Sequence, residues 1–167
     1  MGVLGFLFGL GKSREEKMAI FVLEKAQFHM GQMEWKCELF HNVLKNHPEQ
    51  RGIILNIVSS AIICYLSWCV QARTRSKSAL DFLMYVSQNL RDGVESCFND
   101  ARTIKQHDDF DPLDLFEEGC MRWLIKTMTP YCYGDSVVEN AIGNAYLAEG
   151  NKIRNDAMEF CQKFNIR

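Results

Sequence analysis

Apolar side chains recur every three or four residues along most of this chain, the spacing that places them on one face of an α-helix. Two such stripes lie near the beginning and the end of the periodic region: Met18, Phe21, Val22 and Ala26, then Ile153, Ala157, Phe160 and Phe164. Alternation of β-branched residues is scarce, and only three prolines interrupt the pattern. The sequence therefore predicts an all-α fold of about eight antiparallel helices, arranged as a helical-hairpin, repeat-like bundle in a single domain.

Capping and breaking residues predict where several helices begin and end. Ser13 and Glu16 form a Ser-x-x-Glu capping box, in which each side chain accepts a hydrogen bond from the other residue's backbone N–H. We expect the following helix to end at Gly31, the next to end before Pro48, and a later helix to end at Asp92-Gly93. Each of these boundaries would be a turn between neighbouring helices.

The 18 residues from Ile53 to Val70 carry no charge. That length is the lower limit for a membrane-spanning helix, and Arg73, Arg75 and Lys77 follow it like a positive-inside flank. A helix at the centre of a bundle must also be apolar on every side, and the amphipathic neighbours need a buried partner. We therefore favour a buried core helix over a span, and we keep the three basic residues as candidate interaction residues.

The first eleven residues form an apolar appendage that precedes an all-α domain of residues 12–167. The segment lacks the basic start and the cleavage site of a signal peptide, and it is half the length of a span. We expect it to fold back on the bundle or to bind a partner, with insertion of residues 1–10 at a membrane surface as the alternative. The large apolar side chains that would make these contacts are Val3, Leu4, Phe6, Leu7 and Phe8.

Charge and cysteine content narrow the function classes. The net charge is −2, and no face of the chain is strongly basic, so we expect no nucleic-acid partner. The seven cysteines are an odd number without a Cys-x-x-Cys pair, a pattern typical of reduced thiols in a cytoplasmic protein.

Few residues are spaced for chemistry. Glu38 and His41 form a Glu-x-x-His step, and Cys37 lies four residues before the histidine, but the sequence contains no second ligand pair to complete a metal site. The acidic stretch from Asp108 to Glu118 is better explained by capping, with Asp111 at the N-cap of a helix. No phosphate-binding loop or nucleophile motif is present, so we expect no cofactor, no metal and no catalytic residues, and we lean against an enzyme.

Residues 20–48 resemble a tetratricopeptide repeat, a helical hairpin in which a small residue forms the turn. Leu23, Phe40 and Pro48 match the family's first-helix leucine, second-helix aromatic residue and terminal proline, and Gly31 fits its turn. Residues 142–164 resemble the same repeat more weakly, with Gly150 at the turn. The resemblance implies stacked helix hairpins that bind another protein.

We therefore expect a non-enzymatic, cytoplasmic adaptor-like domain that binds another protein, with an amphipathic helix of the partner in a groove between its hairpins. The first alternative is a peripheral membrane-associated factor that inserts residues 1–10. The second is a metal-binding helical bundle.

Overall fold

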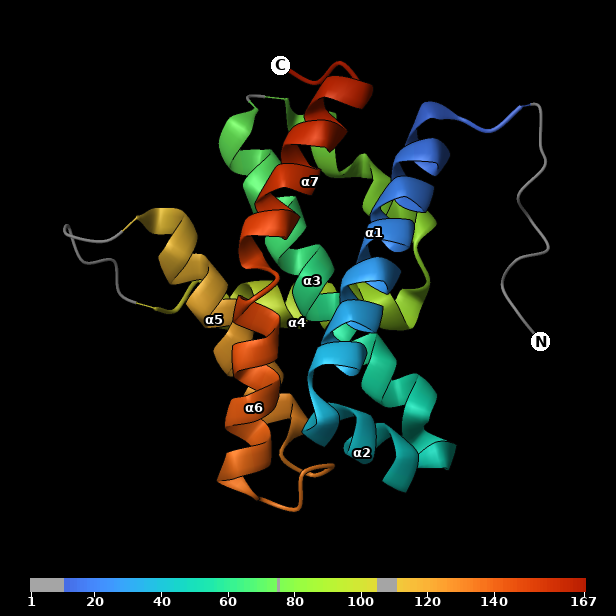
Figure 1. The fold of residues 1–167 in the computed structure, drawn as a ribbon. Coiled ribbons are helices and arrows are strands. Elements are labelled where there is room, and N and C mark those ends of the chain that lie inside the picture. The colour runs from blue at the N-terminus through green and yellow to red at the C-terminus, as the bar shows by residue number, and fades with distance from the viewer. Residues whose placement is uncertain (1–10, 75, 105–110) are drawn as a thin grey trace.

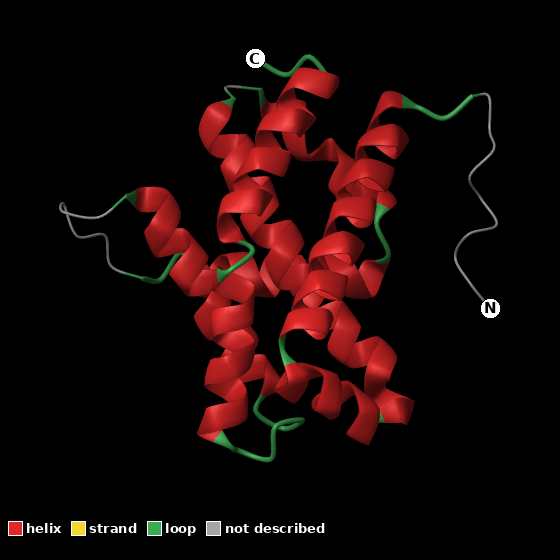
Figure 2. Ribbon diagram, in the orientation of Figure 1, coloured by secondary structure: helices red, strands yellow, loops and turns green. Residues whose placement is uncertain are grey.

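The computed structural model describes residues 11–74, 76–104 and 111–167, and in these residues it contains helices and loops without a strand (Figure 2). The all-α class is therefore confirmed. The same residues form seven α-helices, where about eight were expected. They are α1 (Arg14–Lys36), α2 (Glu38–Asn46), α3 (Arg51–Arg73), α4 (Gln88–Ala101), α5 (Pro112–Met128), α6 (Ser136–Leu147) and α7 (Gly150–Lys163). Two 3-10 segments, Pro48–Gln50 and Lys77–Tyr85, complete the helical structure.

The capping box at the start of α1 is confirmed. The backbone N–H of Ser13 donates to Glu16 Oε2 at 2.7 Å, and the Glu16 N–H donates to Ser13 Oγ at 3.1 Å. The predicted break at Gly31 is wrong, because α1 continues to Lys36 and the chain leaves helical geometry at Cys37. One glycine inside a helix costs only about 1 kcal/mol relative to alanine, and buried side chains on either side of it hold the helix in place.

Helix α3 is the centre of the bundle and packs against α1, α4, α5 and α7 (Figure 1). Thirteen of its residues are buried, among them polar Ser59, Ser60 and Ser67. The segment Pro48–Arg73 is long and apolar enough to cross a membrane by composition, and it is the one such helix in the described part of the chain. Because 67% of its most apolar window is covered by the other helices, it forms the core of this fold.

Helix α4 passes straight through the predicted stop at Asp92-Gly93. Gly93 has a packing role instead: a Cβ atom at this position would lie 2.3 Å from Ser60 Oγ of α3. The glycine therefore lets α4 cross close to the central helix. The glycine that was expected to end a helix is instead a contact point between α4 and α3.

The second half of the chain follows the predicted caps. Asp111 accepts a hydrogen bond from the Leu113 N–H at 2.9 Å, and Pro112 occupies the first position of α5. Helices α6 and α7 follow one another almost end to end at Gly150 (Figure 1). A Cβ atom on Gly150 would lie 1.6 Å from Glu117 Oε1, so the absent side chain leaves room for a buried carboxylate of α5.

Different helices meet at the two ends of the bundle. At one end the start of α1 meets the end of α7, where the Arg14 guanidinium donates to the Phe164 carbonyl. At the other end α2 lies against α6 (Figure 1). The turn between α5 and α6 closes this second end, and it carries the exposed Tyr133.

Candidate functional site

Most of the interaction residues proposed from the sequence lie outside the described residues. This applies to Val3, Leu4, Phe6, Leu7, Phe8 and Arg75, and to the side chain of Lys77. Arg73 is described and is exposed at the last position of α3.

The sequence-derived metal candidates have other roles in the structure. Cys37 is buried at the junction of α1 and α2, whereas Glu38 and His41 are exposed. His41 Nδ1 lies 3.2 Å from Glu34 Oε1, a carboxylate that also accepts from Arg51. These three candidates therefore do not converge on one point.

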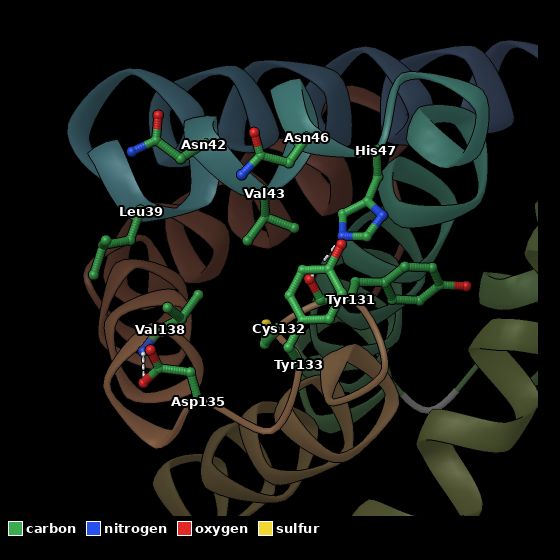
Figure 3. A pocket seen from close by; sticks show the side chains of 10 residues that line it. All are labelled: Leu39, Asn42, Val43, Asn46, His47, Tyr131, Cys132, Tyr133, Asp135 and Val138. Atoms are coloured by element: carbon green, nitrogen blue, oxygen red, sulfur yellow. Dashed lines mark hydrogen bonds between the residues drawn. The ribbon is translucent and has the colours of Figure 1, made fainter.

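A cavity of about 280 Å³ opens where α2 meets the α5–α6 turn, and we call the cavity and its rim the end groove. Figure 3 shows side chains of α2 along one wall and those of the turn and of early α6 along the other. The lining residues are Leu39, Asn42, Val43, Asn46, His47, Tyr131, Cys132, Tyr133, Asp135 and Val138. The groove is open to solvent and combines apolar walls with a few polar groups.

The end of α2 is tied to the α5–α6 turn through a histidine. His47 Nε2 donates to the Tyr131 carbonyl across 3.0 Å, and the centre of its ring lies 5.3 Å from the centre of the Tyr133 ring (Figure 3). Tyr133 itself is 78% exposed and has a φ of 53°, in the left-handed region that costs a non-glycine residue about 1 kcal/mol. Strained backbone of this kind occurs preferentially at functional positions. The turn therefore holds a large aromatic ring in solvent at the rim of the groove.

One acidic residue, Asp135, lines the cavity at the start of α6. Asp135 Oδ1 accepts from the Val137 N–H at 2.8 Å and caps α6, so its carboxylate is fixed at the rim. Glu139 follows one turn later, and its Oε1 atom is buried without a hydrogen-bond partner. In the described part of the chain no lysine or arginine forms an ion pair with either carboxylate. Burial, together with the charges of Glu139 and Asp135, raises the pKa of Cys132 to about 11, which keeps this thiol protonated.

A second arrangement lies in the core. The Sγ atoms of Cys64, Cys97 and Cys120 come from α3, α4 and α5, and all lie within 4.8 Å of one another. We call these three residues the thiol cluster. Each is fully buried, and Cys120 Sγ lies 3.8 Å from Cys64 Sγ. Among the described residues this is the one group of three or more metal-ligating side chains within such a distance.

The thiols of the cluster have divergent acidities. Burial disfavours every thiolate, and it raises the pKa of Cys64 and of Cys97 above the ordinary range. Burial opposes ionisation of Cys120 too, but hydrogen-bonding contacts with Cys64, Cys97 and Tyr146 outweigh it and lower the pKa of Cys120 to about 5. Of the three thiols, Cys120 is therefore the one that loses its proton most readily.

Two buried ion-pair networks brace α7. In the first, Glu149 is 1% exposed and contacts His29 Nδ1 at 2.9 Å and two lysine ammonium groups. His29 Nε2 lies 2.6 Å from Asp156, so both contacts of the ring are hydrogen bonds when both nitrogens carry protons. Burial opposes the charge of Glu149, but hydrogen bonds from Lys152, His29 and Lys36 outweigh it and lower the pKa of Glu149.

The second network joins α7 to α5. Arg154 donates to Asp114, to the Tyr65 hydroxyl and, at 3.1 Å, to Glu117 Oε2. The Tyr65 hydroxyl donates to the same Glu117 oxygen at 3.1 Å. Burial nonetheless raises the pKa of Glu117 above its ordinary value. Because every charged group here has a partner, we assign both networks to the packing of α7.

The sequence indicated neither the end groove nor the thiol cluster. The turn residues Tyr131 and Tyr133 lie between a proline and a glycine, and two tyrosines in so short a turn are the signal that could have marked an aromatic surface. The three cysteines are 33 and 23 residues apart (97 − 64 and 120 − 97). Spacing alone could not show that they meet, because each lies on a different helix.

No protein-family model, no curated protein and no solved structure matches this chain.

Proposed function

We propose that this protein is a non-enzymatic, adaptor-like domain that binds an amphipathic helix of another protein in the end groove. The observation that carries the proposal is Tyr133, an exposed aromatic residue held in left-handed geometry beside an apolar cavity. Exposed tyrosines are enriched among the residues that supply most of the energy of protein interfaces. A cavity of about 280 Å³ lies just below the roughly 300–1,000 Å³ of small-molecule sites, and it suits one or two apolar side chains of a partner.

The acidic residues beside the groove indicate a basic residue on the partner. Asp135 and Glu139 form no ion pair with a lysine or arginine in the described residues, and both lie beside Cys132. The neighbouring rings of Tyr131 and Tyr133 offer faces on which a cation can rest. The bound helix would therefore insert apolar side chains between α2 and the turn and place a lysine or arginine against the α6 side of the rim.

The repeat-like relation between residues 20–48 and 142–164 stays a proposal that favours the same function. Each region covers most of two consecutive helices separated by one or two residues, α1–α2 and α6–α7. However, α1 continues through Gly31, and α6 and α7 lie almost end to end, so neither predicted turn forms the hairpin of the resemblance. The two pairs lie against each other through α2 and α6, and the end groove is at this contact. The seven cysteines of the described residues form no disulfide, in keeping with the proposed cytoplasmic location.

The test is selection of binders from a displayed library of amphipathic helices with leucine, phenylalanine or methionine at positions i, i+4 and i+7. The flanking positions would carry lysine, arginine or glutamate. We expect the selected helices to be enriched in lysine and arginine and to bind the full chain. The Tyr133→Ala variant should weaken binding at least about tenfold, the effect of losing roughly 1.4 kcal/mol at an interface. Tyr85→Ala is the matched control, because Tyr85 is a half-exposed tyrosine in the 3-10 segment, away from the groove.

The charge component has its own variants. Asp135→Asn retains an N-cap acceptor for α6 and removes one charge, and Glu139→Gln removes the other. Each should lower affinity for lysine-flanked helices and reduce the salt dependence of binding. Failure to select any helix, or equal binding by Tyr133→Ala and the unchanged chain, would overturn the proposal. Flotation of the full chain with anionic vesicles, in the absence of helix binding, would favour the membrane alternative in its place.

A further inference from the structure

The thiol cluster has dimensions that suit one metal ion. Thiolates bound to a Zn²⁺ ion at about 2.3 Å stand roughly 3.8 Å apart at tetrahedral angles. The observed distance between Cys64 Sγ and Cys120 Sγ is 3.8 Å, and Cys97 Sγ is within 4.8 Å of both. An ion between the three sulfurs would thus require only a small inward movement of Cys97.

We propose that Cys64, Cys97 and Cys120 bind a soft, thiophilic metal ion of the Zn²⁺ type, which joins α3, α4 and α5 at the centre of the fold. An all-sulfur donor set selects Zn²⁺ or Cu⁺ over Mg²⁺, Ca²⁺ or Mn²⁺, which prefer oxygen ligands. Binding replaces the three thiol protons: one Zn²⁺ and three thiols give one zinc–trithiolate centre of charge −1 and three released protons. A Cu⁺ centre of the same kind would carry −2 in the buried interior, so charge favours the divalent ion.

The surroundings suit a structural ion. The Tyr146 hydroxyl of α6 donates to the Ala61 carbonyl at 3.3 Å, and its oxygen also contacts the Cys120 thiol. It therefore provides a neutral oxygen next to the sulfurs. The three cysteines are completely buried, and closed sites of this kind support folding whereas catalytic zinc sites keep an open position. Because the cluster is closed, the ion would enter while the chain folds, and binding energy would become folding energy.

The experiment is to refold the full chain without metal, with Zn²⁺, with Co²⁺ as a spectroscopic substitute, and with Cu⁺ under reducing conditions. We expect one equivalent of Zn²⁺ to remain after gel filtration and to raise the melting temperature. The Co²⁺ form should show intense thiolate-to-metal charge-transfer absorption. Stronger retention of Cu⁺ than of Zn²⁺ would keep the site and reassign its ion.

Alanine variants show which thiols bind the ion. Cys97→Ala and Cys120→Ala should lose the bound metal, its absorption and the thermal shift. Cys69→Ala is the matched control, because Cys69 is also buried in α3 but lies outside the thiol cluster, and Cys37→Ala tests the sequence-derived candidate. Both control variants should retain one equivalent.

A measurement on the unchanged chain covers the case in which the variants do not fold. X-ray absorption of the zinc-loaded protein should give three sulfur neighbours at about 2.3 Å from the metal. Absence of metal after refolding, a first shell of nitrogen and oxygen, or equal metal binding by Cys120→Ala would overturn the proposal and leave the cysteines as packed apolar groups. A disulfide between two of the three cysteines that persists in reducing buffer would overturn it equally.

Discussion

The thiol cluster and the end groove use cysteine and aromatic residues in opposite ways. In the core, three thiols from three helices meet out of contact with water, and their hydrogen bonds lower the pKa of Cys120 to about 5. In the end groove a single thiol, Cys132, lies beside carboxylates, and its pKa is raised to about 11. The acidity of the same side chain is therefore shifted in opposite directions by its neighbours.

The aromatic residues show the same division between core and rim. Against the core, the ring of the partly buried Trp68 stacks on Phe116 with ring centres 4.2 Å apart. At the groove, Tyr133 projects into solvent from a strained turn. The difference teaches that the packed core and the proposed binding surface lie in separate parts of this molecule. Close packing stabilises the core, whereas exposed side chains on a fixed turn form the groove. Substitutions can therefore change one region without the other.

The largest expected effect is at Trp68. Trp68→Ala removes a partly buried ring that packs on the core, and it should lower the free energy of unfolding by about 3 kcal/mol, the lower end of the range for deletion of a large buried aromatic side chain. Trp35→Ala is the matched control, because Trp35 is 81% exposed and should change stability by less than about 0.5 kcal/mol. Urea unfolding followed by circular dichroism measures both. Equal destabilisation by the two variants would contradict the assignment of stability to the core.

Two glycines, one packed between helices and one on an open helix face, should give the next largest effects. A Cβ atom on Gly119 would lie 2.7 Å from the Ala101 Cα, and backbone of α4 does not yield as a side chain does. Gly119→Ala should therefore cost about 1–3 kcal/mol. A Cβ atom on Gly31 would meet no other atom within 4 Å, so Gly31→Ala should stabilise α1 by about 0.5–1 kcal/mol. Thermal unfolding compares the two, and opposite signs are the expected result.

The pKa values of two carboxylates in the ion-pair networks of α7, Glu149 and Glu117, are shifted in opposite directions, so the two groups should change the stability of the fold in opposite ways as the pH falls. The lowered pKa of Glu149 stabilises the fold above the ordinary value of 4.5, and this stability is lost as the pH falls through the folded-state pKa. The raised pKa of Glu117 has the reverse sign, because the folded protein takes up its proton first as the pH falls. Glu149→Gln should thus flatten the loss of stability in acid, and Glu117→Gln should steepen it.

Urea unfolding between about pH 3 and pH 7 measures these slopes, since stability follows the difference in bound protons between the folded and unfolded states. Lys25 contacts both Asp156 and Glu159 in the first network. It would keep α7 attached to α1 in the Glu149→Gln variant. Identical acid profiles for the two glutamine variants would contradict the opposite pKa shifts.

The smallest expected change follows removal of residues 1–11. The capping box of Ser13 and Glu16 begins α1 without help from the preceding segment. The truncated chain should therefore keep its helical content and its melting temperature within about 2 °C, the shift that corresponds to a fraction of 1 kcal/mol. A large fall in melting temperature would show that the segment contributes to the packed core.

Local patterns in the sequence determined the class, several helix ends and many of the buried faces. The Ser13 box, the Asp111 cap with Pro112 and the stripe of Ile153, Ala157 and Phe160 all appear in the structure as predicted. These features depend on residues within one or two turns of each other, so their physical cause is contained in a short stretch of chain. The same reasoning made the uncharged segment of α3 a core helix, since its amphipathic neighbours required a buried partner.

Only the tertiary structure decided what the glycines, cysteines and turn tyrosines do. Gly31 and Gly93 are breakers by local rule, yet helix packing carries α1 and α4 through them, and Gly93 becomes a point of close approach between α4 and α3. Cys64 meets Cys120, and His47 meets Tyr131, because helices distant in the sequence are brought together by burial of their apolar faces. The free energy gained by burying apolar surface is roughly proportional to its area and does not depend on direction. A sequence pattern therefore specifies which faces are buried without specifying which faces meet.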